Sequence, residues 1–223
     1  MSDIQVVHEY SAQGIRKGPS KALIQLIENL GESLVHHAFS SNGPLVVDQG
    51  CGQLRNVETL LSISNRIVLV DTERQLSTKH LFYDQRLTVC EFAEQHWSDK
   101  EVTVLTAKEF AKLSLNADIV FSINVLDVVL PTTRDELLRA ARRNLSTTGM
   151  LAVFVPRNDT WTLRRCRSAQ RFTDGYVFRN RDAHTFYHNW TNSEMKSLVN
   201  KWGFEIVKDV SVHRYIRLMC RPV

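Results

Sequence analysis

The 223-residue sequence has no long hydrophobic runs, since every apolar run falls far short of the roughly 20 residues needed to cross a bilayer. Its first residues lack the charged and then apolar pattern of a signal peptide. The four cysteines are scattered, with no C-x-x-C pair and no His/Cys cluster at zinc spacing. These absences argue against a transmembrane chain and a structural metal. They predict a cytoplasmic protein with reduced thiols and no membrane partner.

The composition is typical of a globular protein, with 43% hydrophobic and 23% charged residues. It contains no internal repeat and no low-complexity tract. A chain of this length can bury a sizeable core in one domain. We therefore predict a single domain over 1–223, in which 1–43 form an amino-terminal arm and helix and 157–190 form an insertion.

Apolar runs alternate with stretches of helical spacing along most of the chain. The expected strands are 44–48, 66–71, 101–106, 117–125 and 149–156, and the expected helices are 21–38, 56–63, 133–145 and 193–202. Two capping boxes, Thr133-x-x-Glu136 and Thr191-x-x-Glu194, mark helix starts, and Gly203 is placed to end the last helix. Residues 204–210 and 215–220 are typical of an antiparallel hairpin. The pattern predicts an α/β fold with a doubly wound, mostly parallel sheet and a hairpin that closes one edge.

The stretch "VVDQGCGQLRN", residues 46–56, predicts a glycine-rich turn directly after the first strand. In a doubly wound sheet this turn lies at the carboxyl ends of the strands, where ligands bind. Gly50 and Gly52 allow close approach of the backbone, and the helix expected from Asn56 directs its exposed N–H groups to the same place. Asp71 ends the next strand, where a carboxylate can accept hydrogen bonds from both hydroxyls of a ribose. The spacing favours a ligand that contains adenosine over an ordinary tight turn with a solvated Asp71.

Two features of the turn distinguish a dinucleotide from S-adenosylmethionine. The dinucleotide fingerprint requires a third glycine where this sequence has Leu54 and Arg55. Asp48 stands two residues before Gly50, where a negative charge suits an ammonium and a sulfonium but not a pyrophosphate. The turn therefore favours S-adenosylmethionine, and a dinucleotide-dependent oxidoreductase stays a distant alternative.

Together with "IVLVD", "ADIVFSINVLDVV" and "WTNSEMKSLVNKWGFEIV", the turn resembles the Rossmann-like, seven-stranded class I S-adenosylmethionine-dependent methyltransferases. The resemblance implies that Asp48, Gly50, Cys51 and Gly52 hold the methionine end of the cofactor and that Asp71 holds the ribose. Leu54 replaces the usual third glycine and is expected to narrow the approach. Thr106 and Ala107 stand where an acid usually follows the third strand. The complete expected cofactor set is Asp48, Gly50, Cys51, Gly52, Leu54, Asp71, Thr72, Ala107, Asn124 and Val125.

The resemblance also implies that residues 122–127 line the gap between the methyl donor and its acceptor. A sulfonium methyl is already activated, so the transfer depends mainly on positioning, and a base is needed only if the acceptor must lose a proton. The catalytic candidates are Asn124, as a hydrogen-bond acceptor, and Asp127, as a carboxylate. Asp127 is equally well explained as a loop acid that supports the next helix. The sequence "SINV" replaces the D/N-P-P-Y/F tetrapeptide of many DNA amino-methyltransferases, which disfavours that design.

The segment 157–190 has seven arginines against three acids and seven aromatic residues. Arginines with aromatic residues suit nucleic acid, by phosphate pairing and base stacking. On that hypothesis Arg164, Arg165 and Arg167 contact phosphates of RNA or DNA, and Trp161 and Tyr187 contact the acceptor. The alternative is a lid over a small-molecule site, with its aromatic rings in a small core and its arginines solvated.

Two classes of function follow from the sequence. The favoured one is an active S-adenosylmethionine-dependent methyltransferase, because Asp48, both glycines and Asp71 are all present. The other is a degenerate methyltransferase fold that serves as a nucleic-acid-binding or assembly module. Both leave the methyl acceptor and the oligomeric state open.

Overall fold

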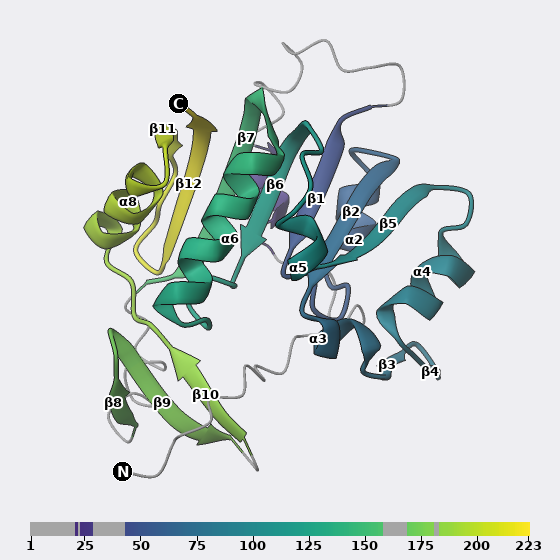
Figure 1. The fold of residues 1–223 in the computed structure, drawn as a ribbon, viewed down its shortest axis with the longest axis horizontal. Coiled ribbons are helices and arrows are strands. Elements are labelled where there is room, and N and C mark those ends of the chain that lie inside the picture. The colour runs from purple at the N-terminus through teal and green to yellow at the C-terminus, as the bar shows by residue number, and fades with distance from the viewer. Residues whose placement is uncertain (1–20, 22, 29–42, 158–168, 181–182) are drawn as a thin grey trace.

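The computed structural model describes residues 21, 23–28, 43–157, 169–180 and 183–223 and contains a seven-stranded sheet (Figure 1). Its strands are β1 (Leu45–Gln49), β2 (Arg66–Asp71), β5 (Glu101–Thr106), β6 (Ala117–Ile123), β7 (Leu145–Pro156), β11 (Phe204–Asp209) and β12 (Tyr215–Pro222). The strand order is β11-β12-β7-β6-β1-β2-β5. The first five strands in sequence pair in parallel, and β12 pairs antiparallel with β7 and β11. The predicted sheet and its terminal hairpin are confirmed.

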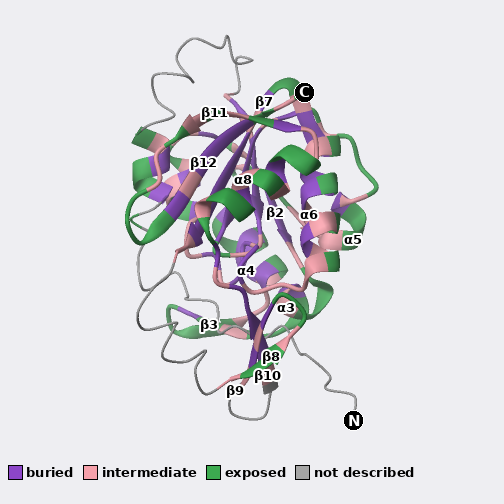
Figure 2. Ribbon diagram, turned by 90° about the vertical axis from the view of Figure 1, so that its left-hand side faces the viewer, coloured by how far each residue is buried: buried purple, intermediate pink, exposed green. Residues whose placement is uncertain are grey.

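Helices cover both faces of this sheet, as Figure 2 shows by the buried strands between partly exposed helices. The helices are α2 (Val57–Leu61), α3 (Glu73–Ser77), α4 (Val89–His96), α5 (Ala107–Phe110), α6 (Pro131–Asn144) and α8 (Asn192–Lys201). Residues 23–28, α2 and α4 contribute to one buried cluster, together with Val46 and Phe121 of the sheet. The other face packs against α5, α6 and α8 through residues such as Val47 and Val120. Both faces of β1 are therefore buried, and the turn after β1 leaves the sheet at the carboxyl end of this strand.

The helix ends confirm one predicted cap and correct the other. Thr191 and Glu194 form the predicted capping box at the start of α8, and Gly203, with φ +74°, follows its end. In contrast, α6 begins at Pro131, two residues before the predicted cap Thr133. Proline is favoured in the first turn because the missing N–H would have no partner inside the helix. The prediction of a capping box at Thr133 is therefore wrong.

Two small sheets of short strands were not predicted. The first is a hairpin of β3 (His80–Phe82) and β4 (Gln85–Leu87). The second consists of β8 (Gln170–Phe172), β9 (Gly175–Asn180) and β10 (Ala183–Tyr187). This second sheet lies within the basic aromatic segment, below the carboxyl ends of β6 and β7 in Figure 1. Within the described ranges, no helix has the length and apolar character needed to cross a bilayer.

Candidate functional site

The glycine turn leaves the sheet at the point where the chain reverses its direction of winding, because β1 has β2 on one side and β6 on the other. The N–H groups of Gly50 and Cys51 donate to the carbonyl of Val70, at 2.7 and 3.1 Å. Gly50 has a φ of +85°, and a Cβ atom there would lie 2.3 Å from Cγ2 of Val125. Only glycine fits this position, which brings the loop after β6 directly against the turn.

Asp71 connects the end of β2 to the same turn. Its Oδ2 accepts a hydrogen bond from the N–H of Gly52 at 2.8 Å, and its Oδ1 accepts one from the N–H of Thr72 at 2.7 Å. Burial raises the pKa of Asp71, and these two hydrogen bonds oppose the rise. Each carboxylate oxygen can accept a second hydrogen bond, so the predicted pairing with ribose hydroxyls stays available. Thr106, the last residue of β5, pairs in register with Asp71 of β2. Ala107 therefore follows at the same edge of the sheet.

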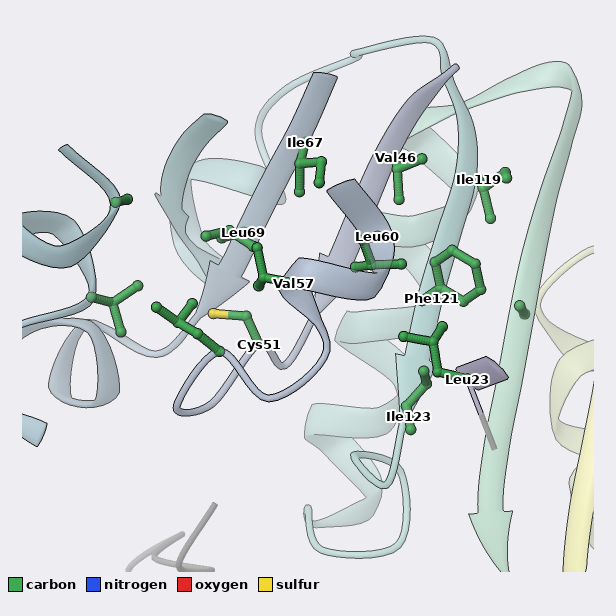
Figure 3. Close-up of a cluster of buried hydrophobic side chains, with 14 of the residues drawn as sticks. Leu23, Val46, Cys51, Val57, Leu60, Ile67, Leu69, Ile119, Phe121 and Ile123 are labelled. Carbon is green, nitrogen blue, oxygen red and sulfur yellow. The ribbon is translucent and has the colours of Figure 1, made fainter. Parts of the chain in front are cut away.

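Cys51 and Leu54 point into the protein and not into a ligand site. Both are buried in the cluster drawn in Figure 3, where Cys51 lies among Val57 and Leu69. Burial, followed by the nearby charge of Asp71, raises the pKa of the Cys51 thiol, so a nucleophilic thiolate is disfavoured. Leu54 has the left-handed backbone, with φ +63°, that the missing glycine would adopt, and its side chain is fully buried. Only the backbone of Leu54 is therefore left to line the turn, and the narrowing of the cofactor's approach at Leu54 stays a prediction.

Asp48 is a buried carboxylate directly before the turn. Its side chain is 1% exposed, and its Oδ2 atom has no hydrogen-bond partner among the described residues. Burial, followed by repulsion from Asp71, raises the pKa of Asp48 to about 7. A buried acid without a counter-charge is costly to ionise, and a bound cation would remove that cost. The site is thus electrostatically prepared for a positively charged ligand.

The loop after β6 forms the wall opposite the turn. Asn124 is exposed at this edge in a left-handed backbone conformation, with φ +56°, and its N–H donates to the carbonyl of Phe154 at 2.8 Å. Asp127 lies behind it, 3% exposed, with its carbonyl accepting the N–H of His188 at 2.7 Å. Burial raises the pKa of Asp127 to about 7, although Arg134 opposes the rise. The structure thus separates the two catalytic candidates into one exposed and one buried side chain.

An ion pair between a buried arginine and an exposed aspartate, which the sequence did not predict, fixes the β8–β10 sheet to this wall. Arg134 of α6 donates to the carbonyl of Leu126 at 2.9 Å and pairs with Asp174, between β8 and β9. Its guanidinium lies 4.7 Å from the ring centroid of Trp190. His188 Nδ1 lies 2.7 Å from the carbonyl of Asp174, so this nitrogen carries the proton of the neutral ring. These contacts support the interpretation of the neighbouring acid, Asp127, as part of the loop's support.

The acceptor residues expected on the basic segment have different outcomes. Arg164, Arg165, Arg167 and Trp161 lie outside the described residues. Tyr187 ends β10 and is 3% exposed, and Phe186, Val177 and Trp190 are buried with it. Its burial argues against the predicted contact with an acceptor. The described part of the segment matches the alternative, an insertion with a small aromatic core.

A hollow lies at the opposite edge of the sheet from the glycine turn. It has a volume of about 530 Å³ and is lined by Gly43 and residues 61–66 and 99–101. These residues surround the amino ends of β2 and β5. Ligands of doubly wound sheets bind at the carboxyl ends, where the glycine turn lies, so the chemistry is assigned to the turn. The described residues contain no group of three or more side chains suited to hold a metal ion.

Comparison with known proteins identifies the fold. No family model matches the sequence. The uncharacterized protein YmfD of Escherichia coli (strain K12) is 20% identical over 194 residues, which cover 86% of this chain and 82% of that protein. The structure of Burkholderia thailandensis 1,6-didemethyltoxoflavin-N1-methyltransferase, with bound 1,6-didemethyltoxoflavin and S-adenosylhomocysteine, gives a TM-score of 0.60 at 18% identity. The match covers 91% of this chain and 76% of the other.

A second solved structure is magnesium protoporphyrin IX methyltransferase (ChlM) from Synechocystis PCC 6803 with bound S-adenosylhomocysteine. It gives a TM-score of 0.59 at 14% identity and covers 96% of this chain and 90% of the other. The chain therefore has the seven-stranded fold of class I S-adenosylmethionine-dependent methyltransferases, as the sequence predicts.

Proposed function

We propose that the protein is an S-adenosylmethionine-dependent methyltransferase that acts on a small molecule. The observation that carries this proposal is the buried carboxylate of Asp48 next to the Gly50 turn, whose Oδ2 has no hydrogen-bond partner in the described part of the chain. An acid in this position suits a ligand with an ammonium and a sulfonium, and it would repel a pyrophosphate. The same argument disfavours a dinucleotide-dependent oxidoreductase.

The residues around the turn fit the cofactor in its expected orientation. Asp48 and the backbone of Gly50 and Gly52 would hold the methionine end, and Asp71 would accept hydrogen bonds from the ribose hydroxyls. The remaining cofactor contacts assigned to this edge are those of Thr72, Ala107, Asn124 and Val125, together with the backbone of Cys51 and Leu54, whose side chains are buried. When bound, S-adenosylmethionine supplies a methyl group that is already activated by its positive sulfur.

Substitution of Asp71 by alanine is expected to weaken S-adenosylmethionine binding at least tenfold. Two hydrogen bonds from ribose hydroxyls to a carboxylate are lost, each with a cost of about 1.5–3 kcal/mol. Asp118→Ala is the matched control, since Asp118 accepts a hydrogen bond from the N–H of Leu45 at the opposite edge of the sheet. Calorimetry should show normal affinity for the control. Equal affinities of both variants would remove Asp71 from the binding site.

The chemistry at the acceptor is assigned to the wall after β6. We expect Asn124 to accept a hydrogen bond from the acceptor and to align it with the methyl group. Asp127, with a pKa of about 7, could take up a proton, but its burial and its Arg134 neighbour favour a supporting role. Positioning is then the main contribution of this wall.

The Asn124→Ala variant should lose turnover with little change in cofactor affinity, because the lost contact is made to the acceptor in the transition state. Asn116→Ala is the matched control, since Asn116 is also exposed and has a similar φ of +54° but lies at the other end of β6. Methyl transfer is measured with a radiolabelled donor and small-molecule extracts. Full activity of Asn124→Ala would refute the role of Asn124, and Asp127→Asn is tested in the same assay.

A small-molecule acceptor is favoured over a nucleic acid by the described part of the insertion. Three of its aromatic rings, Phe186, Tyr187 and Trp190, are buried and cannot stack on bases, whereas Phe172, Tyr176 and Phe178 are half-buried. One solved neighbour named above has 1,6-didemethyltoxoflavin bound. The other is named as a magnesium protoporphyrin IX methyltransferase. The RNA or DNA hypothesis rests on arginines outside the described residues. A protein that binds neither S-adenosylmethionine nor its product would instead be the degenerate binding module.

A further inference from the structure

Three side chains at the carboxyl end of β7 and the start of β12 form a stacked cluster, here named the Tyr215 platform. The rings of Phe154 and Tyr215 have centroids 4.9 Å apart and planes inclined by 29°. The guanidinium of Arg217 lies 5.6 Å from the Phe154 centroid and 5.8 Å from that of Tyr215. Phe154 is buried as the base of the platform, whereas Tyr215 is 37% exposed and Arg217 is half-buried. The platform thus offers an accessible aromatic ring beside an accessible cation.

The strand register places this platform in line with the glycine turn. Ile123 of β6 pairs with Phe154, which pairs in turn with Arg217. Gln49 of β1 pairs with Ser122 of β6, so the position opposite Ile123 is the next residue, Gly50. With neighbouring strands about 4.8 Å apart, Arg217 lies three strand steps, or about 14 Å, from the level of Gly50. Asn124 stands between them, with its N–H bonded to the carbonyl of Phe154.

Arg217 has no counter-charge among the described residues. Its Nε atom is buried without a hydrogen-bond partner, and no described carboxylate pairs with its guanidinium. On the same strand, Arg221 pairs with Glu205 at 2.7 Å. An arginine whose guanidinium is held beside aromatic rings can present its N–H groups to a carboxylate. The missing partner of Arg217 therefore points to an anion supplied from outside.

We infer that the Tyr215 platform is an acceptor subsite for a planar aromatic carboxylate. The ring stacks on Tyr215, the carboxylate pairs with Arg217, and the far end of the molecule extends past Asn124 toward the donor methyl. Because Arg217 and the level of Gly50 are about 14 Å apart, we expect the carboxylate and the methylated atom to lie at opposite ends of an elongated molecule, such as one with two fused rings. This inference rests on the proposed function, because the methyl donor defines which end reacts.

The test uses 6-hydroxy-2-naphthoate and its neutral amide, 6-hydroxy-2-naphthamide, as probes of equal shape and different charge. Binding is followed by fluorescence on protein saturated with S-adenosylhomocysteine, whose own binding is first measured by calorimetry. The naphthoate should bind about tenfold more tightly than the amide, as expected for a charge-assisted pair. Arg217→Gln should remove this preference and leave amide binding unchanged. Arg221→Gln, the control on the same strand, should leave both affinities unchanged.

Stacking is tested separately with Tyr215→Leu, which should weaken both probes several-fold, and with Tyr215→Phe, which should not. Equal affinities for the two probes, no binding of either at millimolar concentration, or the same behaviour of Arg217→Gln and Arg221→Gln would each overturn the inference. Failure of S-adenosylhomocysteine to bind would instead refute the proposed function. The two probes would then be titrated without it, and the same criteria would judge the platform.

Discussion

Replacement of Gly50 by alanine is expected to weaken S-adenosylmethionine binding by roughly a hundredfold, a loss of about 3 kcal/mol. The new Cβ atom would lie 2.3 Å from Cγ2 of Val125, so the turn and the loop after β6 must move apart. The left-handed backbone, with φ +85°, adds a cost of about 1–2 kcal/mol to folding itself. Calorimetry measures the affinity, and urea unfolding measures the stability.

Gly43→Ala separates the two costs. Gly43 has a similar φ of +78°, but its added Cβ would meet nothing closer than 3.9 Å. This control should lose a similar amount of stability through its backbone while keeping normal affinity for the ligand. If Gly50→Ala binds S-adenosylmethionine as the wild type does, the turn is not the binding site.

The Asp48→Asn variant is expected to be more stable than the wild type at pH 8 and less able to bind the methyl donor. The pKa of Asp48 is about 7 in the folded protein, above its ordinary value of 3.8. The folded state therefore keeps a proton that the unfolded state releases, and stability falls as the pH rises from about 4 to 7. Asparagine has no such loss, so the variant should gain about 2–4 kcal/mol at pH 8. The difference should disappear toward pH 4, as measured by urea unfolding across this range.

The same carboxylate gives a signature in binding. A sulfonium ligand favours the ionised acid, so the wild-type affinity should rise about tenfold between pH 5.5 and pH 7, with release of a proton. Asp48→Asn should bind weakly and without this dependence on pH. A variant that binds as tightly as the wild type, or a wild-type affinity that is flat over this range, would contradict the role of Asp48.

Local signals in the sequence predicted the part of the site that lies on consecutive elements. Asp48 and Asp71 lie at the ends of buried strands, and Gly50 directly follows the first strand, so their place at the carboxyl edge follows from the alternation of strands and helices. The terminal hairpin was predicted by the same kind of pattern. Thr133 was mistaken for a cap because a capping box is a short motif, and Pro131 had already started the helix.

Contacts between distant segments could not be predicted in this way. Arg134 and Asp174 are 40 positions apart, and no periodicity links them. Arg217 and Phe154 become neighbours only through the antiparallel register of β12 with β7. The direction of the Leu54 side chain depends on its left-handed backbone conformation. The sequence did not indicate this conformation, because it has leucine and not glycine at this position. Strand β8 has only three residues and β9 carries Arg179, so their pattern is weaker than that of the buried strands.

The most direct test of the central claim is a calorimetric titration of the wild-type protein at pH 7.5 with S-adenosylmethionine, S-adenosylhomocysteine and NAD. The carboxylates Asp48 and Asp71 on either side of the glycine turn predict binding of the first two at one site and no heat with NAD. Binding of NAD in their place, or no heat with any of the three at millimolar concentration, would contradict the assignment of this turn to a methyl donor.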